Sequence, residues 1–271
     1  MDSPDEPPPI DILERSRADW NREARNGCRW SIPVDQATIA RARAGDWDLV
    51  LTPNLPVPRA WFGDVRGRDV LCLASGGGQQ APVLAAAGAR VTSFDLSDEQ
   101  LACDRLVADR EGLALTCLRG NMADLSVLRD GTFDLIFHPV SNVFAEDVRP
   151  VWADCFRVLR PGGVLLAGFI NPFFFLFDHD HALASGQLIV KYRLPYSDLT
   201  NPDPVAKERW FQSGEAVNFS HSLDAQIGGQ LAVGFLITGF YEDSWADEVT
   251  PLNRHSPMYL ATRSLKPRAG E

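Results

Sequence analysis

Short apolar runs alternate with stretches of helical periodicity from residue 68 onward. The apolar runs predict strands at 70–74, 90–95, 113–119, 133–138 and 164–169. The stretches between them predict helices at 81–88, 98–111 and 148–160, the last of which is stopped by Pro161-Gly162-Gly163. Because strands that alternate with helices form βαβ units, we expect a mostly parallel sheet with helices on both faces.

The regular pattern lapses between residues 171 and 219, where aromatic residues, proline and aspartate are frequent. It resumes with a predicted helix at roughly 221–234 and two closing strands at 235–241 and 258–263. The chain therefore predicts an α/β domain built on a seven-stranded sheet, with a cap insert at residues 171–219 after the fifth strand.

The N-terminal part of the chain differs from this pattern. Residues 1–9 are rich in Pro, Asp and Glu, which predicts a disordered tail. Residues 10–45 show helical periodicity that is interrupted at 30–34, and a proline-rich connector follows up to residue 62. We therefore expect three parts: the tail (1–9), an N-terminal helical extension or lid (10–62), and a main domain (63–271) that contains the cap insert.

The acidic composition narrows the choice of partner. The formal net charge is −10 at pH 7, whereas a protein that binds a polyanion normally carries a basic stripe, so we expect no nucleic-acid partner. No apolar run approaches the ~20 residues that span a bilayer. The acidic, proline-rich start resembles neither a secretory signal nor a transit peptide, and we expect a cytoplasmic protein without a membrane partner. The five dispersed cysteines are typical of reduced thiols.

A glycine-rich bend follows the first predicted strand. Gly76, Gly77 and Gly78 precede the next helix, and glycines there let the backbone approach a ligand and expose free N–H groups. Asp95 ends the second strand, where a carboxylate can accept both hydroxyls of a ribose. Because Gly76, Gly78 and Ala81 also satisfy the dinucleotide fingerprint, this element alone leaves an NAD-dependent oxidoreductase open.

Five ordered blocks extend the evidence beyond the bend. They are residues 71–78, 91–97, 120–125, 133–137 and 157–166, and the last contains the Pro-Gly-Gly turn. In these blocks the chain resembles the class I, Rossmann-like S-adenosylmethionine-dependent methyltransferases, within them the small-molecule group. The resemblance implies the Rossmann-like methyltransferase sheet, S-adenosyl-L-methionine as cofactor, and methyl transfer to a small molecule. The chain departs from the family at Cys72, where an acidic residue is usual, and at Ala74, where a glycine is usual.

The resemblance also implies roles along the carboxyl edge of the sheet. The loop at 75–78 would hold the methionine part of the cofactor, Asp95 the ribose, and Leu96 the adenine, while the end of the fourth strand would face the sulfonium. The cofactor-binding residues predicted in this way are Ala74, Ser75, Gly76, Gly77, Gly78, Asp95, Leu96, Asn121, Met122, Ala123, His138 and Pro139.

Catalytic candidates are few, because in-line displacement of a methyl group from a sulfonium depends mainly on positioning. A base is needed only when the acceptor starts protonated. His138 and Asn142 follow the fourth strand, and His221 precedes a predicted helix, which makes these three the polar candidates. The alternative role for the two histidines is capping of the local backbone.

Two features bear on the acceptor. The aromatic residues Trp20, Trp30, Phe173, Tyr192 and Trp210 could line an apolar pocket or simply pack the cap onto the sheet, and a pocket would favour a partly apolar acceptor. Asp178 and Asp180 could bind magnesium, although a surface turn explains the same residues and we otherwise expect no metal. A magnesium-bound prenyl diphosphate acceptor for C-methylation and a non-catalytic cofactor-binding relative stay open as alternatives.

Overall fold

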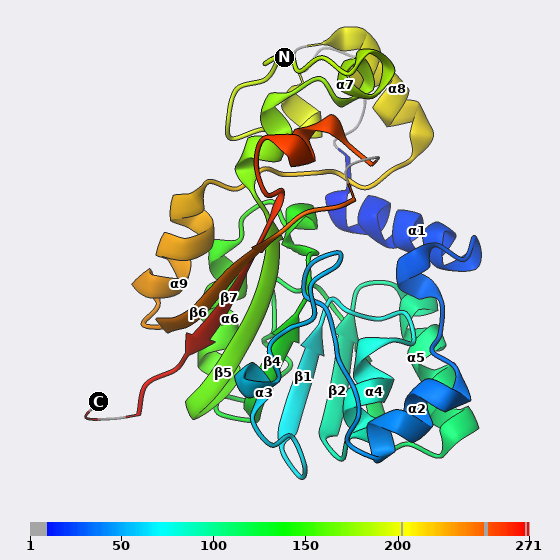
Figure 1. Ribbon diagram of the computed structural model, residues 1–271, viewed down its shortest axis with the longest axis vertical. Coiled ribbons are helices and arrows are strands. Elements are labelled where there is room, and N and C mark those ends of the chain that lie inside the picture. Colours follow the sequence, from blue (N-terminus) through cyan, green and yellow to red (C-terminus); the bar gives the residue numbers. More distant parts are fainter. Residues whose placement is uncertain (1–9, 202, 247–248, 269, 271) are drawn as a thin grey trace, which may run out of the picture.

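A seven-stranded sheet forms the centre of the protein in the computed structural model, which describes residues 10–201, 203–246, 249–268 and 270 (Figure 1). The strand order is β3-β2-β1-β4-β5-β7-β6. β7 pairs antiparallel with both β5 and β6, while the other pairs are parallel, so the predicted seven-stranded, mostly parallel sheet is confirmed. The strands are β1 (Asp69–Leu73), β2 (Arg90–Asp95), β3 (Leu115–Arg119), β4 (Phe133–His138), β5 (Leu159–Ile170), β6 (Leu236–Asp243) and β7 (Tyr259–Leu265).

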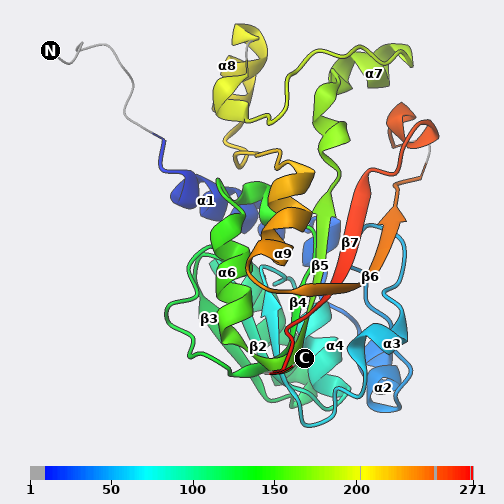
Figure 2. The ribbon, with the colours of Figure 1, turned by 90° about the vertical axis from the view of Figure 1, so that its left-hand side faces the viewer.

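Helices cover both faces of the sheet, because side chains along each buried strand alternate between the faces. Val70 and Cys72 of β1 pack in one core cluster with residues of α2 (Gln36–Arg43), α3 (Arg59–Phe62) and α4 (Gln80–Ala86). Leu71 and Leu73 pack in a second cluster with Trp152 of α6 (Arg149–Val158). Figure 2 shows α6 and α9 (Gly229–Ala232) on the face opposite α2 and α3.

Two predicted boundaries were wrong. The helix predicted to stop at Pro161-Gly162-Gly163 already ends at Val158, and β5 begins at Leu159. The Pro-Gly-Gly turn therefore lies within β5, where Gly162 N donates to Lys266 O at 2.7 Å. The helix predicted at 221–234 is interrupted: a π-helical segment, Asp224–Gly228, precedes the short α9.

The N-terminal extension contains three helical segments before α3. They are α1 (Ile12–Arg25), a 3₁₀ turn (Arg29–Ser31) and α2, and the side chains of Asp11 and Asp35 cap α1 and α2. Residues 44–58 form no helix and follow the sheet instead, with Val140 N donating to Leu51 O at 3.0 Å. The predicted disordered tail, residues 1–9, lies outside the described residues.

The segment after β5 stands above the carboxyl ends of the parallel strands (Figures 1 and 2). It contains two helices that the sequence did not predict, α7 (His179–Ser185) and α8 (Pro204–Ser213), and 3₁₀ turns at Pro172–Leu176 and Asp198–Thr200. Another 3₁₀ turn, Pro251–Arg254, precedes β7. Among the described helices, none is both long and apolar enough to cross a bilayer.

Helix α1 joins this cap to the sheet. Its Arg15 donates to Trp210 O at 2.8 Å and to Glu215 O at 2.6 Å, and Asp19 accepts from Ala216 N at 2.6 Å. On its other side α1 packs against α5 (Asp98–Glu111), the helix that follows β2 (Figure 1). Helix α1 therefore bridges the cap, about two hundred residues further along the chain, and α5, about one hundred residues further along.

Candidate active site

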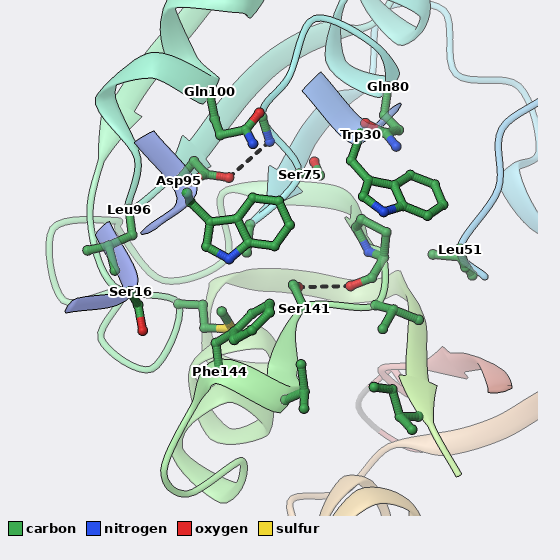
Figure 3. A pocket seen from close by; sticks show the side chains of 18 of the residues that line it. Ser16, Trp30, Leu51, Ser75, Gln80, Asp95, Leu96, Gln100, Ser141 and Phe144 are labelled. Atoms are coloured by element: carbon green, nitrogen blue, oxygen red, sulfur yellow. Dashed lines mark hydrogen bonds between the residues drawn. The ribbon is translucent and has the colours of Figure 1, made fainter. Parts of the chain in front are cut away.

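A cavity of about 280 Å³ lies where β1, β2 and β4 end, and residues of α1 line one side of it. Figure 3 shows side chains of its wall. The carboxyl edge of an open α/β sheet is the usual ligand site of such folds. The wall is mainly apolar and contains five aromatic side chains, those of Trp20, Trp30, Phe144, Trp245 and Tyr259. The other wall residues are Leu13, Ser16, Val50, Leu51, Thr52, Pro53, Ala74, Ser75, Gly76, Gln80, Asp95, Leu96, Gln100, Asn121, Met122, Pro139, Val140, Ser141, Val143, Ile170 and Asn218.

Asp95 is fixed by the backbone on both sides of it. Its Oδ2 accepts from Gly76 N at 3.0 Å and its Oδ1 from Ser97 N at 2.9 Å. Burial raises the pKa of this carboxyl group, and the two N–H donors oppose the shift. Each carboxylate oxygen has further lone pairs, so the group can accept two hydroxyl donors from a ligand.

The glycine bend serves two different contacts. Gly76 lies on the cavity wall, whereas the N-terminal extension covers Gly77 and Gly78. A Cβ on Gly77 would lie 2.2 Å from Trp30 O, and one on Gly78 would lie 2.9 Å from Pro33 Cα. These two glycines therefore admit the extension, which in turn places the Trp30 side chain on the wall.

The buried carboxylate of Asp104 holds the glycine bend in place from the neighbouring helix, α5. Asp104 of α5 accepts from Gly78 N at 2.7 Å and from Ser93 Oγ at 2.6 Å. Burial raises the pKa of Asp104 to about 7. Ala74, at the start of the bend, has φ = +48°, a left-handed conformation that is costly for any residue with a Cβ.

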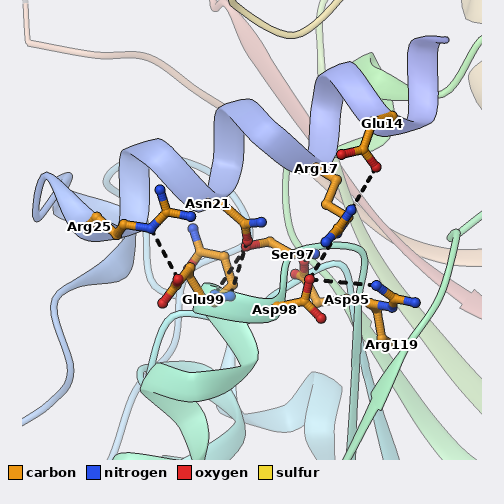
Figure 4. Close-up of polar contacts among 10 residues, drawn as sticks. Glu14, Arg17, Asn21, Arg25, Asp95, Ser97, Asp98, Glu99 and Arg119 are labelled. Carbon is orange, nitrogen blue, oxygen red and sulfur yellow. Dashed lines mark hydrogen bonds and ion pairs between the residues drawn. The ribbon is translucent and has the colours of Figure 1, made fainter.

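Helix α1 closes the side of the cavity above β2 (Figure 4). Asn21 Oδ1 accepts from Ser97 Oγ at 2.7 Å and from Glu99 N at 3.1 Å, and this contact is buried. Arg17 Nε lies 2.8 Å from an oxygen of Asp98, and Arg25 forms a more exposed ion pair with Glu99. Helix α1 is thus bound to Ser97 and to the first residues of α5, which follow Asp95.

The comparisons with known proteins agree with this geometry. Residues 71–167 match the model of a family described as "Methyltransferase domain". A Bacillus subtilis protein named "Uncharacterized methyltransferase YbaJ" is 46% identical over 255 residues, which cover 94% of this chain and 98% of that protein. The chain belongs to the class I S-adenosylmethionine-dependent methyltransferases. The family excludes the NAD-dependent alternative and makes the protein an enzyme with S-adenosyl-L-methionine as its cofactor.

Solved methyltransferases share the fold. An S-adenosylmethionine-dependent methyltransferase from Mesorhizobium loti superposes with a TM-score of 0.59 at 20% identity, over 76% of this chain and 94% of that one. The 1,6-didemethyltoxoflavin-N1-methyltransferase from Burkholderia thailandensis superposes with a TM-score of 0.54 at 16% identity, over 98% of this chain and 94% of that one. At these identities the likeness concerns the fold.

The cavity of this methyltransferase offers the acceptors that its cofactor requires. Ser16 Oγ, Gln80 Oε1 and Gln100 Oε1 are buried wall atoms that have no hydrogen-bond partner among the described residues. A buried polar atom without a partner is costly, and a ligand donor would satisfy it. S-adenosylmethionine brings such donors in its ammonium, ribose hydroxyl and adenine amino groups. The residues present therefore fit the cofactor.

Most of the predicted cofactor-binding residues lie on the wall. They are Ala74, Ser75, Gly76, Asp95, Leu96, Asn121, Met122 and Pro139, and their contacts with the cofactor stay predictions. The other four do not line the cavity. Gly77 and Gly78 face the extension, Ala123 packs in the core behind Met122, and His138 is fully buried.

The three predicted catalytic residues lie behind the wall. His138 Nδ1 is 3.0 Å from Leu73 O, and burial lowers the pKa of this histidine to about 4. Asn142 and Gln226 pair through their amides, with Nδ2 of Asn142 donating at 3.0 Å. His221 Nε2 lies 3.1 Å from Asn142 O, and burial lowers the pKa of His221 as well. This geometry favours the bracing role for both histidines and gives none of the three a direct path to an acceptor.

The predicted aromatic residues divide between wall and cap. Trp20 and Trp30 line the cavity. The remaining three, which the prediction placed in the pocket, pack within the cap instead: Phe173 lies against Phe177, Tyr192 against Tyr196, and Trp210 under the Arg15 guanidinium. The residues lie in the same segment, but only their packing decides which face the cavity.

The weak magnesium candidates are engaged in separate ion pairs. Asp178 caps α7 and lies 2.8 Å from Lys191 Nζ, while Asp180 pairs with Arg209. Neither carboxylate lines the cavity, and no group of three or more His, Cys, Asp or Glu suited to a metal occurs among the described residues. The surface-turn interpretation accounts for both aspartates.

The sequence analysis did not predict several of the wall residues. These residues come from widely separated parts of the chain, and they are loop 50–53, Gln80, Gln100, Ser141, Phe144, Trp245 and Tyr259. The strand-end rule could have identified Ser141 and Phe144, since both follow β4. Trp245 and Tyr259 lie after β6 and at the start of β7, and only the antiparallel pairing of those strands brings them to the site.

Proposed function

We propose that this methyltransferase transfers the methyl group of S-adenosylmethionine to a small, partly apolar acceptor by in-line displacement within the cavity at the carboxyl edge of the sheet. The observation that carries the proposal is the composition of the cavity wall. We call the part of the wall around Asp95 the cofactor half, and the largely aromatic part that continues from it the acceptor half. Bound S-adenosylmethionine would supply an electrophilic methyl group on a sulfonium.

The cofactor half consists of the bend at 74–76 and the ends of β2 and β3. Asp95 would accept both ribose hydroxyls, because the backbone N–H groups of Gly76 and Ser97 hold its carboxylate in place. Leu96 and Met122 would pack on the adenine, as their apolar side chains line this half. Gln80 Oε1 and Gln100 Oε1, which have no other partner among the described residues, would accept from the methionine ammonium, because position 72 offers no carboxylate.

The acceptor half lies between α1 and the segments after β4 and β6. Trp20 contacts Phe144 edge to face, with ring centroids 5.5 Å apart, and Trp30 contacts Trp245 at 5.9 Å. Aromatic pairs of this kind form rigid apolar walls. They exclude water and restrict the acceptor to orientations in which its nucleophilic atom faces the methyl group, which is the main contribution that this chain can make to the rate.

The prenyl diphosphate alternative receives no support from this site. Its diphosphate would need magnesium or basic side chains, whereas Asp178 and Asp180 pair with Lys191 and Arg209 away from the wall. Among the described wall residues none is Lys, Arg or His.

Labelled cofactor tests the proposal. The protein is incubated with methyl-deuterated S-adenosylmethionine and a small-molecule extract, and products are analysed by mass. Asp95→Ala should weaken cofactor binding by about 10- to 100-fold, since each charge-assisted hydrogen bond contributes about 1.5–3 kcal/mol. Asp46→Ala, at an exposed position outside the cavity, is the matched control. The absence of any labelled product, or equal cofactor affinity in both variants, would contradict the proposal.

A further inference from the structure

The cavity wall is nearly free of charge. Among its described residues Asp95 is the only charged side chain, and the two backbone donors beside it place it in the cofactor half. The acceptor half, from α1 to Tyr259, contains aliphatic and aromatic side chains, hydroxyls and one amide. A charged acceptor would lose its hydration there and meet no counter-ion among the described wall residues, which is costly in an apolar site. The Arg29 guanidinium lies against the rings of Trp30 and Trp245 but is not part of the wall.

The wall also lacks a group that could remove a proton at neutral pH. Its titratable residues within the described part of the chain are Asp95 and Tyr259. Tyr259 OH accepts from Trp245 Nε1 at 2.6 Å, and burial raises the pKa of the phenol to about 12. Asp95 lies in the cofactor half, where the two backbone N–H groups and the proposed ribose hydroxyls would occupy its carboxylate.

The nearest alternatives lie behind the wall. His138 is fully buried beyond the surface formed by Pro139 and Ser141, and its Nδ1 is engaged with Leu73 O. Asp104 is also fully buried and accepts from Gly78 N and Ser93 Oγ. Ser141 Oγ on the wall lies 3.4 Å from His138 Nδ1, but that nitrogen faces Leu73 O and the hydroxyl donates to Pro139 O, so the pair does not relay a proton. Among the described residues, an acceptor that must lose a proton before it attacks therefore has no partner in the cavity.

We infer that the acceptor is an uncharged, weakly basic aromatic nitrogen heterocycle, which attacks through a ring nitrogen whose lone pair is free at neutral pH. The inference rests on the proposed methyl transfer. A phenol, an alcohol or an alkylammonium would require a base before it could attack, whereas a carboxylate or a diphosphate would enter the wall as an uncompensated negative charge. A flat neutral heterocycle matches a wall of indole and phenyl rings.

The step balances without a base. The nitrogen lone pair forms the new N–C bond while the S–C bond breaks, and its electron pair stays on sulfur. The positive charge passes from sulfur to the heterocycle, where the Trp20 ring on the wall can stabilise it by cation–π attraction. Trp30 is less available for this role, because the Arg29 guanidinium already lies over its ring, 4.5 Å from the centroid. A heterocycle that carries an N–H group loses that proton to water after release.

Four bicyclic probes of similar size separate the possibilities: isoquinoline, 2-naphthol, 2-naphthoate and 2-naphthylmethylamine. Each is incubated with the full-length protein and methyl-deuterated S-adenosylmethionine. We expect N-methylisoquinolinium to form at least about tenfold faster than any other labelled product, because the other three need a base or a counter-ion. The rate of transfer to isoquinoline from the saturated complex should be the same at about pH 7 and about pH 9, since the proposed step removes no proton.

Three results would overturn the inference. They are transfer to the carboxylate or the amine at a comparable rate, a preference for 2-naphthol with a rate that rises with pH, and transfer to none of the four. If Tyr259→Phe abolished that rise with pH, the base would be Tyr259. A thermal shift with S-adenosylmethionine and labelled products from the extract report on the proposed function separately, so methyl transfer can stand when the heterocycle fails.

Discussion

Gly77→Ala is the perturbation that tests most directly whether the N-terminal extension builds the cavity. The substitution places a Cβ 2.2 Å from Trp30 O and 2.9 Å from Gln100 Oε1, at a residue whose φ is +124°. The backbone strain costs about 1–3 kcal/mol. Relief of the clash requires the Trp30 backbone to shift by roughly an ångström, and overpacking of this kind costs about a further 1–3 kcal/mol.

Gly45→Ala is the matched control. Gly45 also has a left-handed backbone, with φ = +88°, but a Cβ there would meet nothing within 4 Å. The control should therefore lose only the strain energy and leave cofactor binding unchanged. Gly77→Ala should lose about twice as much stability and bind S-adenosylmethionine about tenfold more weakly, equivalent to 1.4 kcal/mol, because Trp30 leaves its place on the wall.

Urea denaturation gives the two stabilities, and isothermal titration with S-adenosylmethionine gives the two affinities. If both variants lost the same stability and bound the cofactor equally, the extension would not press on the glycine bend as described. A loss of affinity in Gly45→Ala as well would point to a general loosening of the fold instead.

Three other substitutions test separate contacts. Asn21→Ala should destabilise the protein by about 1–3 kcal/mol, because it leaves two donors of the α5 N-terminus without a partner. Arg25→Ala, which removes an exposed ion pair, should cost less than about 1 kcal/mol; equal losses in thermal denaturation would refute the difference. Ala74→Gly should raise the free energy of unfolding by up to about 1 kcal/mol, since glycine adopts the positive φ without strain, and a lower urea midpoint would argue against strain at this residue. Asp104 has a folded pKa of about 7, above its unfolded value of about 3.9, so its contribution to stability is largest below about pH 4 and is lost as the pH rises through 7. Asp104→Asn should remove this pH dependence of the free energy of unfolding. The buried His138, with its pKa of about 4, acts in the opposite direction, but it does so equally in both proteins. Parallel stability–pH curves for the two proteins would show that Asp104 does not titrate in this range.

The sheet could be predicted because its information is local. β2 and β4 begin and end where their apolar runs do, and the alternation of buried residues in β1 assigns each side chain to one face. The bend at Gly76 and the carboxylate of Asp95 were equally predictable, since both sit at strand ends that a parallel sheet brings to one edge. For the strands and for the helices between β1 and β5, element type and order follow from periodicity, whereas α7 and α8 in the cap were missed.

The interior of the site could not be predicted in the same way. His138 ends β4 next to the cavity, yet its ring turns toward Leu73 O and Trp152. Asn142 is held by Gln226, which lies far along the chain in a π-helical segment. The periodicity of the sequence does not predict these contacts, because they depend on how elements that are distant in the chain pack together. The same limit applies to Trp210, whose partner Arg15 belongs to α1.

Cys72 stands where the family usually has an acidic residue, and the buried carboxylate of Asp104 lies nearby on α5. Cys72 is fully buried on β1, and the negative charge of Asp104 contributes, after burial itself, to raising the pKa of its thiol. A second carboxylate at position 72 would therefore lie within the field of a carboxylate that is already costly to bury, and each would raise the pKa of the other. Asp104 reaches the glycine bend from α5 and accepts from Gly78 N, so one buried carboxylate supports the bend from the neighbouring helix. In the proposed function, the neutral cysteine would leave the methionine ammonium to uncharged acceptors such as the carbonyl oxygens of Gln80 and Gln100, in keeping with a wall whose described residues carry almost no charge.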